Sequence, residues 1–413
     1  MKSFPNIDWI VIFQRNRVER ECGAKPHFWN YFFRNIAFCF VDNVDLRLLK
    51  RGDNSRILFY QSFIERESSR KQFYNVQQLV NSDLISYGPE KKNKIHILLG
   101  LYLLFFNLPF WFFQLIRVGA PFSERPRYIH SLIKFFFISR KINNLTSINN
   151  YNLLVTFCDA YPEESFISQL FKAKGKTTVT LQHGAFSAWR ENELINSGVE
   201  LRAFSSDYML CWNKLTIDEA VKCGISSERL KVVGILGYVK DQPDDWICPN
   251  NNTFGVVIGH ESFEEENLKL IECANRIAEL KGMGYYLKLH PNYYEHYFDD
   301  KVSKEFYKGN IKKGIPISDY ANMVDFSLVG SSSVYLELVY IRHDVIRYST
   351  GGVTDKFKDV KIGKVLHSPQ EVESLFGKDH EPSENGLDDL FDYLCGYKDV
   401  AREYKRFFSK YVS

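Results

Sequence analysis

Residues 325–348 read DFSLVGSSSVYLELVYIRHDVIRY, a pattern that predicts, in order, a strand, a loop, a helix and a second strand. The apolar runs at the two ends predict strands at 325–329 and 345–348. The longer apolar run between them predicts a helix at 334–341, and the glycine and serines at 330–333 predict the loop before it. A strand followed by a helix and another strand is the repeating unit of a parallel α/β sheet.

The same alternation continues upstream. It predicts strands at 9–13, 57–61, 153–157, 177–181, 207–212, 230–233, 254–258 and 285–289, and helices at 163–174, 216–223 and 264–281. The segment 236–253 interrupts the pattern with Pro, Asp and Asn, which are turn residues. We therefore predict an α/β fold of two Rossmann-like domains facing a cleft, with an N-terminal domain at 1–235, a linker at 236–253 and a C-terminal domain at 254–413.

The charged residues are distributed unevenly along the chain of 413 residues. Residues 1–150 hold 22 Lys and Arg against 11 Asp and Glu, a net charge of +11, whereas the remainder has a net charge of −8. The basic part also holds the longest apolar run, 95–118. A basic, aromatic segment at about 91–141 is typical of proteins that bind a membrane surface.

The apolar run at 95–118 has three interpretations. It is about as long as a membrane-spanning helix, but Asn107 and Pro109 interrupt it. A buried helix hairpin and a helix lying on the membrane are the alternatives we favour, ahead of a true span.

Several classes of protein lose support from what the sequence lacks. It has no Gly-x-Gly-x-x-Gly, Walker or Gly-x-Ser-x-Gly sequence, which disfavours dehydrogenases, P-loop ATPases and serine hydrolases. The aromatic residues of the basic N-terminal region fall in apolar blocks rather than at spaced stacking positions, so we expect no nucleic-acid partner.

Cysteine usage favours a reducing compartment. The eight cysteines are scattered and form no Cys-x-x-Cys pair. The apolar stretch at 9–13 is broken by polar residues at 14–17 before it reaches the length of a signal-peptide core. We expect a cytoplasmic protein, peripheral on the inner face of the membrane through its basic segment.

Polar loops follow several of the predicted strands. They are 182–184, 259–262, 288–291 and 330–333. Ligands of open parallel sheets bind outside the carboxyl ends of the strands, so these four loops can share one cleft.

The serine loop has the composition of a phosphate site. The hydroxyls of Ser331, Ser332 and Ser333, with the free N–H groups of the next helical turn, can hold a phosphate. Glu337 lies four residues after Ser333, where its carboxylate can accept hydrogen bonds from ribose hydroxyls. The alternative is an ordinary helix cap followed by an exposed glutamate.

Two of the polar loops in the C-terminal half contain histidines, and one of these also contains a lysine. Lys288 and His290 end one predicted strand, and Pro291 fixes the backbone directly after the histidine. A rigid imidazole there can donate to a phosphate oxygen or stabilise a departing diphosphate, and His260 would face the same cleft. The alternative is a structural or solvated histidine.

The N-terminal half offers a candidate general base. His183 stands between Gln182 and Gly184, and the glycine permits a backbone conformation that turns the imidazole toward the cleft. The ordinary pKa of histidine, about 6.5, suits a base that takes a proton from an acceptor hydroxyl. Asp159 is the rival base or the partner that orients His183, although a helix-cap role is the interpretation we favour for it.

Residues 318–348 resemble the donor-binding segment of the CDP-glycerol glycerophosphotransferases and related bacterial capsule polysaccharide transferases. In these families an Asp-containing strand is followed by Ser-Ser, an acidic residue four positions later and an apolar strand, and Ser332, Ser333 and Glu337 match that spacing. KLHP at 288–291 is similar to the families' His-Pro motif, and QHG at 182–184 to their His-Gly motif. The resemblance covers roughly residues 150–350.

The resemblance implies the two-Rossmann fold called GT-B and a transfer that needs no bound metal or other cofactor. The absence of any Asp-x-Asp sequence agrees with this. By resemblance, His290, Ser332 and Ser333 hold the donor phosphates, Glu337 holds the ribose, and His183 is the base or an acceptor contact. We add His260, Lys288 and Ser331 to the donor side, and Gln182 and Gly184 to the acceptor side.

Two departures leave the donor open. Asp344 stands where many relatives have Pro, and their Gly-x-Pro-x-x-Asp is represented only by residues 234–237, GILG. The first hypothesis is a glycosyltransferase that moves a sugar from a nucleotide sugar to a growing surface polysaccharide, of capsule or O-antigen type, on a lipid-linked glycan acceptor. The alternatives are a CDP-polyol phosphotransferase and a non-catalytic scaffold subunit with the same fold.

Overall fold

The structure is a computed structural model. It describes residues 46–50, 54–62, 67–87, 116, 125–182, 189–190, 193–194, 201–236, 251–351, 355, 357–377, 384–397 and 399–412. The predicted strand at 9–13, the residues His183 and Gly184, and the apolar run apart from Ile116 lie outside these ranges. Among the helices within them, none combines the length and the apolar character needed to cross a bilayer.

The first domain is built on a seven-stranded sheet in the order β1-β3-β2-β4-β5-β8-β9. Its strands are β1 (Leu46–Leu49), β2 (Ile57–Tyr60), β3 (Asp83–Tyr87), β4 (Leu153–Thr156), β5 (Thr177–Leu181), β8 (Tyr208–Cys211) and β9 (Leu230–Val232). Neighbouring strands are parallel except for β1 and β3. The strands predicted at 57–61 and from residue 153 onward are confirmed, whereas β1 and β3 were not predicted.

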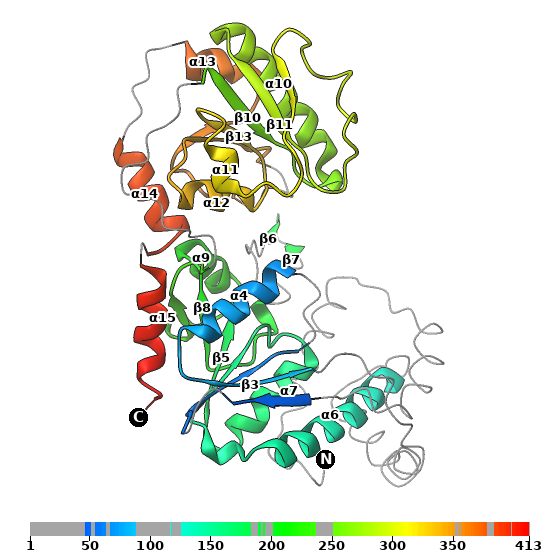
Figure 1. Cartoon of the computed structure of the whole chain (residues 1–413), viewed down its shortest axis with the longest axis vertical. Coiled ribbons are helices and arrows are strands. Elements are labelled where there is room, and N and C mark those ends of the chain that lie inside the picture. Colours follow the sequence, from blue (N-terminus) through cyan, green and yellow to red (C-terminus); the bar gives the residue numbers. More distant parts are fainter. Residues whose placement is uncertain are drawn as a thin grey trace.

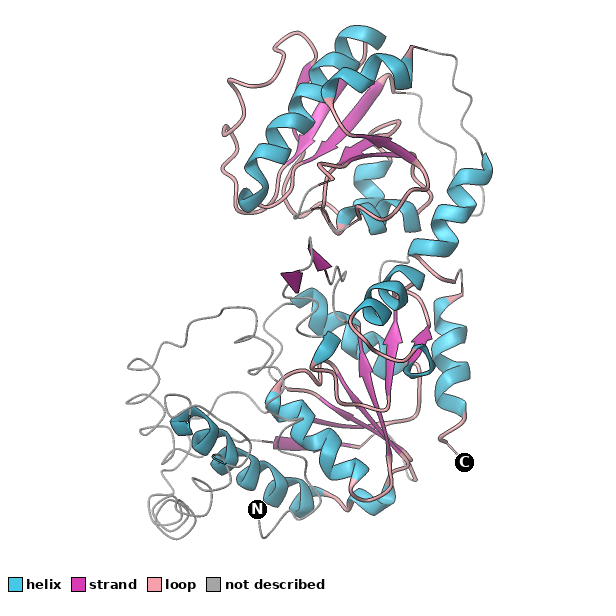
Figure 2. Cartoon of the chain, turned by 180° about the vertical axis from the view of Figure 1, so that it is seen from behind, coloured by secondary structure: helices cyan, strands magenta, loops and turns pink. Residues whose placement is uncertain are grey.

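Helices cover this sheet, as Figure 2 shows. They are α4 (Glu67–Gln78), α6 (Arg125–Leu145), α7 (Pro162–Lys172) and α9 (Lys214–Lys222). α7 begins with a proline and two glutamates in its first turn and ends on Lys172, which suits the helix dipole. The rings of Phe135 and Phe166 stack 4.7 Å apart between α6 and α7, so the basic stretch at 125–141 is a helix packed on the first domain.

The second domain has six parallel strands in the order β12-β11-β10-β13-β14-β15. They are β10 (Thr253–Val257), β11 (Gly284–Lys288), β12 (Tyr307–Asn310), β13 (Ser327–Val329), β14 (Val345–Tyr348) and β15 (Lys364–Leu366). This is the Rossmann strand order, in which the first strand lies between the second and the fourth. The four strands predicted here are confirmed, while β12 and β15 were missed.

Helix α10 (Glu264–Lys281) packs on the second sheet. Its buried apolar face consists of Leu270, Ile271, Cys273, Ala274, Ile277 and Ala278. Three glutamates occupy its first turn, and the left-handed Gly282, with φ of 64°, ends it. Two short helices, α11 (Ile317–Ala321) and α12 (Val334–Tyr340), lie on the side of this domain that faces the first domain (Figure 1).

The end of the chain returns to the first domain. Helix α14 (Glu384–Leu394) contacts α9, where the Asn213 side chain donates to the Leu394 carbonyl at 2.7 Å. Helix α15 (Val400–Ser409) then lies along the first domain (Figure 1), with the Phe408 ring 5.9 Å from the Phe59 ring of β2. Our boundary at residue 254 assigned α15 to the second domain. Its apolar face packs instead against the first, because an amphipathic helix must bury that face somewhere.

Replacing Phe408 with alanine tests the packing of α15. Phe408 is fully buried, so Phe408→Ala is expected to lower the free energy of unfolding of the first domain by about 3–5 kcal/mol. The control is Arg406→Ala on the same helix, because the Arg406 side chain is 77% exposed. Urea unfolding followed by circular dichroism measures both, and equal midpoints for the two variants would contradict this account of α15.

Candidate functional site

Three loops meet at the carboxyl edge of the second sheet. β10 pairs with β11 on one side and with β13 on the other, so the strand order reverses between β10 and β13. Ligands of doubly wound sheets bind at such a reversal. The loops that leave these strands are 259–262, 289–292 and 330–333, and they hold most of the predicted donor-side residues.

His260 and His290 lie against each other in two of these loops. Their ring centroids are 5.0 Å apart in an edge-to-face arrangement. The side-chain amide of Asn292 lies 3.0 Å from His260 Nε2, and its backbone N–H donates to His290 Nδ1 at 3.3 Å. Because Nδ1 accepts this hydrogen bond, the neutral His290 ring carries its proton on Nε2, where it can donate to a ligand.

The electrostatic surroundings keep His290 neutral. Burial lowers the pKa of His290 below its ordinary value, the neighbouring His260 lowers it further, and Glu261 opposes the shift. Lys313 also lowers this pKa, and its Nζ donates to the Pro291 carbonyl at 3.0 Å. Lys313 therefore adds a positive charge beside His290 and holds the backbone of the same loop.

Two oppositely charged residues, Lys288 and Glu337, interact with each other at the carboxyl end of β11. Lys288 ends β11 and Glu337 lies in the first turn of α12. Burial lowers the pKa of Lys288, and the charge of Glu337 works against that change. Burial raises the pKa of Glu337 to about 7, while Lys288 pulls it down. Glu337 is thus a partly buried carboxyl group that titrates near neutral pH.

The three serines of the third loop differ in what they can reach. Ser331 is only 3% exposed, and both its N–H and its hydroxyl bind the Glu266 carboxylate, at 2.6 and 3.1 Å. The Ser332 hydroxyl is partly buried and accepts the N–H of Val334 at 3.3 Å, while Ser333 is exposed. Ser332 and Ser333 are therefore open to a ligand, whereas Ser331 is turned into the domain.

A buried ion pair lies behind Ser331. Arg347 of β14 donates to Asp355 at 3.0 Å, and both side chains are almost inaccessible to solvent. The Ser331 hydroxyl also lies 3.4 Å from Asp355. Sequence reasoning missed this group because Arg347 stands inside an apolar strand and Asp355 in a loop without a motif.

In the first domain, Gln182 is buried. Its side-chain oxygen accepts the backbone N–H of Trp212 at 2.6 Å, and its carbonyl accepts from Gln72 at 2.9 Å. These bonds tie the end of β5 to β8 and to α4. His183 and Gly184, which follow it, lie outside the described residues, so the predicted base is not placed.

Asp159 is buried and holds a neighbouring segment. Its carboxylate accepts from the N–H and the hydroxyl of Ser205, at 3.1 and 3.2 Å, and from the N–H of Ser206. Burial raises the pKa of Asp159, and these hydrogen bonds oppose the rise. The helix-cap interpretation is wrong, because the N-cap of α7 is Tyr161 and Asp159 anchors residues 205–206 instead.

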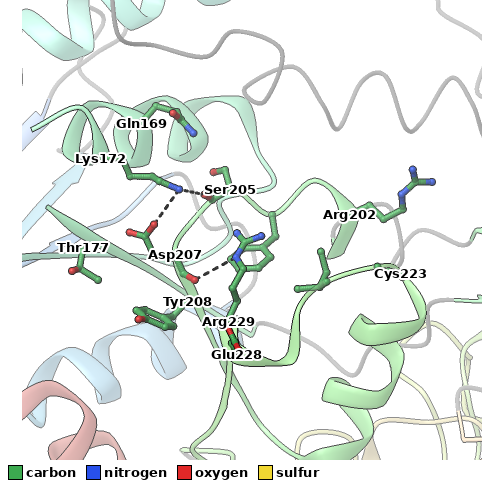
Figure 3. A pocket seen from close by; sticks show the side chains of 13 residues that line it. Gln169, Lys172, Thr177, Arg202, Ser205, Asp207, Tyr208, Cys223, Glu228 and Arg229 are labelled. Carbon is green, nitrogen blue, oxygen red and sulfur yellow. Dashed lines mark hydrogen bonds and ion pairs between the residues drawn. The ribbon is translucent and has the colours of Figure 1, made fainter. Parts of the chain in front are cut away.

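A cavity of about 720 Å³ lies at the opposite, amino edge of the first sheet (Figure 3). Three of its charged lining residues already have partners: Lys172 pairs with Asp207 at 3.1 Å, and Arg229 donates to the Asp207 carbonyl at 3.4 Å. No predicted site residue lines it, and ligands of such sheets bind at the other edge. The candidate site therefore remains at the carboxyl edge of the second sheet.

Metal ligands were not expected from the sequence. Within the residues that the structure describes, no three His, Cys, Asp or Glu side chains are grouped so that they could hold a metal ion. The expectation of a reaction without a metal stays a prediction.

Known proteins resemble this chain in fold. Its sequence matches no protein-family model and no curated protein. The structure of S. aureus MnaA with UDP matches with a TM-score of 0.51 at 10% identity, covering 86% of this chain and 97% of that one. The UDP-GlcNAc 2-epimerase of Methanocaldococcus jannaschii gives 0.49 at 11% identity, covering 86% and 99%. The wall teichoic acid polymerase TagF, soaked with CDPG, gives 0.43 at 10% identity, covering 98% of each chain.

The likeness to MnaA and the strand order lead to the same conclusion about architecture. This chain has two Rossmann-like domains built on mainly parallel sheets, the arrangement called GT-B. At 10% identity the likeness shows the fold alone. The resemblance to the CDP-glycerol glycerophosphotransferases beyond the fold stays a prediction.

Proposed function

We propose that this protein is a glycosyltransferase that moves a sugar from a nucleotide-activated donor to a growing surface polysaccharide. The observation that carries the proposal is the set of side chains at the strand reversal of the second sheet, where His260 and His290 lie edge to face. This is where doubly wound sheets bind nucleotides. The structure of MnaA, which has the same fold, was solved with UDP, and this supports a nucleotide as the occupant.

Each donor-side residue has a role in this proposal. His290 donates from Nε2 to the diphosphate, with His260 beside it, and the hydroxyls of Ser332 and Ser333 bind the phosphate oxygens. Glu337 accepts from the ribose hydroxyls, and Lys288 balances its charge. We leave Ser331 out of direct contact because its hydroxyl and N–H are taken by Glu266.

The reaction is a direct displacement at the anomeric carbon of the donor sugar. The acceptor oxygen forms a bond to this carbon while the bond to the diphosphate oxygen breaks, and the acceptor proton passes to a base. The negative charge that develops on the departing nucleotide is stabilised by the neighbouring histidines and Lys288, without a metal. Preorganised donors in a partly desolvated site are effective at this task.

We assign the base to His183, on the acceptor side with Gly184. Gln182 is left out of direct contact because it is buried and its side-chain oxygen and carbonyl are taken by Trp212 and Gln72. Asp159 is the weaker candidate, because its carboxylate is already occupied by Ser205 and Ser206. The acceptor is a lipid-linked glycan, and the basic segment at 91–141 brings the enzyme to the membrane surface. Part of that segment is α6, which packs on the first domain.

A CDP-polyol phosphotransferase is the second candidate. The spacing of Ser332, Ser333 and Glu337 favours it, because the CDP-glycerol families share that spacing. Calorimetric titration with CMP, CDP, UDP and GDP, followed by hydrolysis assays with matching nucleotide sugars and with CDP-glycerol, separates the two. If the protein turns over CDP-glycerol and none of the nucleotide sugars, the second candidate replaces the first. A protein that binds none of the four nucleotides would contradict both and leave the scaffold hypothesis.

Replacing His290 tests the assigned phosphate contact. His290→Ala is expected to lower kcat/KM for the donor by at least about 100-fold, because a hydrogen-bond donor to the leaving group is lost. The matched control is His296→Ala in the same loop, because the His296 side chain is 76% exposed. It should stay within about twofold of wild type, as exposed side chains usually do. Equal activity of the two variants would remove His290 from the mechanism.

The pKa of Glu337 predicts how nucleotide binding depends on pH. The ionised carboxylate accepts ribose hydroxyls best, so binding favours that form and affinity should fall as the pH drops below about 7, where free Glu337 gains a proton. Glu337→Gln cannot ionise and should lose this dependence. Nucleotide affinity is measured for the wild type and for Glu337→Gln between about pH 5.5 and 8.5. The histidines and the nucleotide phosphates titrate in both proteins, so their effects cancel in the ratio of the two affinities. A ratio that does not change with pH would contradict the assignment of Glu337.

A further inference from the structure

Two consecutive buried side chains of α10 contact all three loops of the candidate site. Glu266 is 4% exposed and Asn267 is fully buried, although both lie in the polar start of the helix. We infer that Glu266 and Asn267 are positioning residues, which set the spacing of the loops that receive the donor. The inference rests on the proposed function, since it concerns how the same site is held.

Asn267 joins the two histidine loops. Its side-chain oxygen accepts the N–H of Gly259 at 2.8 Å. Its amide nitrogen lies within hydrogen-bond distance of the carbonyls of Gly259 and His260, at 3.3 and 3.4 Å, and of the Tyr293 hydroxyl at 3.1 Å. Gly259 and His260 follow β10, whereas Tyr293 stands three residues after His290. One amide therefore fixes the positions of both histidines relative to each other.

Glu266 holds the serine loop on the other side of the strand reversal. Its two carboxylate oxygens accept the N–H and the hydroxyl of Ser331, at 2.6 and 3.1 Å. A side chain on Gly330 would place its Cβ 2.0 Å from Glu266 Oε1, so the carboxylate lies directly against the loop backbone. Ser332 and Ser333 follow this anchored segment, and their location depends on it.

A second buried carboxylate, that of Asp355, also contacts the serine loop. Asp355 lies 3.4 Å from the Ser331 hydroxyl and is itself bound by Arg347 at 3.0 Å and by the N–H of Phe357 at 2.8 Å. A buried carboxylate is costly unless its hydrogen bonds are complete. Removing the Glu266 carboxylate thus leaves Ser331 with a single weak acceptor and frees the backbone at Gly330.

A purely structural role is the competing explanation, and α10 offers a matched control. Asn275 lies two turns further along the helix, and its side chain makes a similar set of bonds. It accepts from Ser303 N–H at 2.9 Å and from the Tyr285 hydroxyl at 2.6 Å, and it donates to the Lys301 carbonyl at 3.0 Å. Tyr285 lies near the start of β11, so Asn275 acts at the amino edge of the sheet, away from the site.

The test compares Asn267→Ala with Asn275→Ala by calorimetric titration with UDP and CDP and by thermal unfolding. Asn267→Ala should bind the nucleotide at least about tenfold more weakly, since small displacements of positioned groups have large effects. Asn275→Ala should bind within about twofold of wild type, even where its melting temperature falls as far. Equal loss of affinity in the two variants, or no loss in either, overturns the inference. If Asn267→Ala does not fold, Asn267→Asp replaces it, because it keeps the acceptor for Gly259 and loses the amide donor.

Glu266 is tested by conservative rescue. Glu266→Ala should raise the donor KM at least about tenfold with a smaller effect on kcat. Glu266→Gln, which still accepts the Ser331 N–H, should return to within about threefold of wild type. Equal KM values for the two variants overturn the role of Glu266. If the wild type binds none of the nucleotides, the proposed function fails and this inference with it. If the wild type binds and the variants bind equally well, only the positioning role is wrong.

Discussion

Parallel pairing of β10 with strands on both sides is the constraint on which the candidate site depends. Every strand of a parallel sheet ends at the same edge, so loops some 30 to 40 residues apart in sequence come together there. Because the strand order reverses between β10 and β13, the crossover connections on the two sides of this point lie on opposite faces of the sheet. This leaves space for a ligand between the loops. The helices then need only hold the loops in place, and α10 does so with two side chains.

The candidate site contains positively charged side chains, although the region of the chain that forms it has a net negative charge. Residues 151–413 have a net charge of −8, yet the proposed donor is an anion. Lys313 places a positive charge beside the neutral, hydrogen-bond-donating ring of His290, and partial burial strengthens such local interactions relative to distant screened charges. The acidic surplus is elsewhere, for example in the exposed glutamates at the start of α10. If the proposed donor binds here, the placement of nearby charges matters more than their sum over the region.

Sequence patterns predicted the regular part of this architecture well. Strands with uninterrupted apolar runs, such as β5 at Thr177–Leu181, were found at their observed positions. Three of the four predicted loops lie at the carboxyl edge of the second sheet, whereas the fourth, at 182–184, lies mostly outside the described residues and its place in a shared cleft stays a prediction. β12 at Tyr307–Asn310 (YKGN) was missed because an edge strand can be polar, and α15 was missed because no partner for it is visible in the chain. Glu266 was not singled out, because it is one of three consecutive glutamates and its partner Ser331 lies in a loop 65 residues away. Such tertiary hydrogen bonds leave no local pattern.

The return of α15 to the first sheet has a consequence for how the chain is made. All strands of the second domain lie between residues 253 and 366, so that domain has its whole sheet while the last helix is still being synthesised. The first domain begins earlier but lacks the rings of Tyr404, Phe407 and Phe408 until residues 404–408 have been synthesised. Domains usually complete their folding in the order of synthesis. Here that order cannot hold strictly: the packing of the first domain is complete only after the whole second sheet has been synthesised.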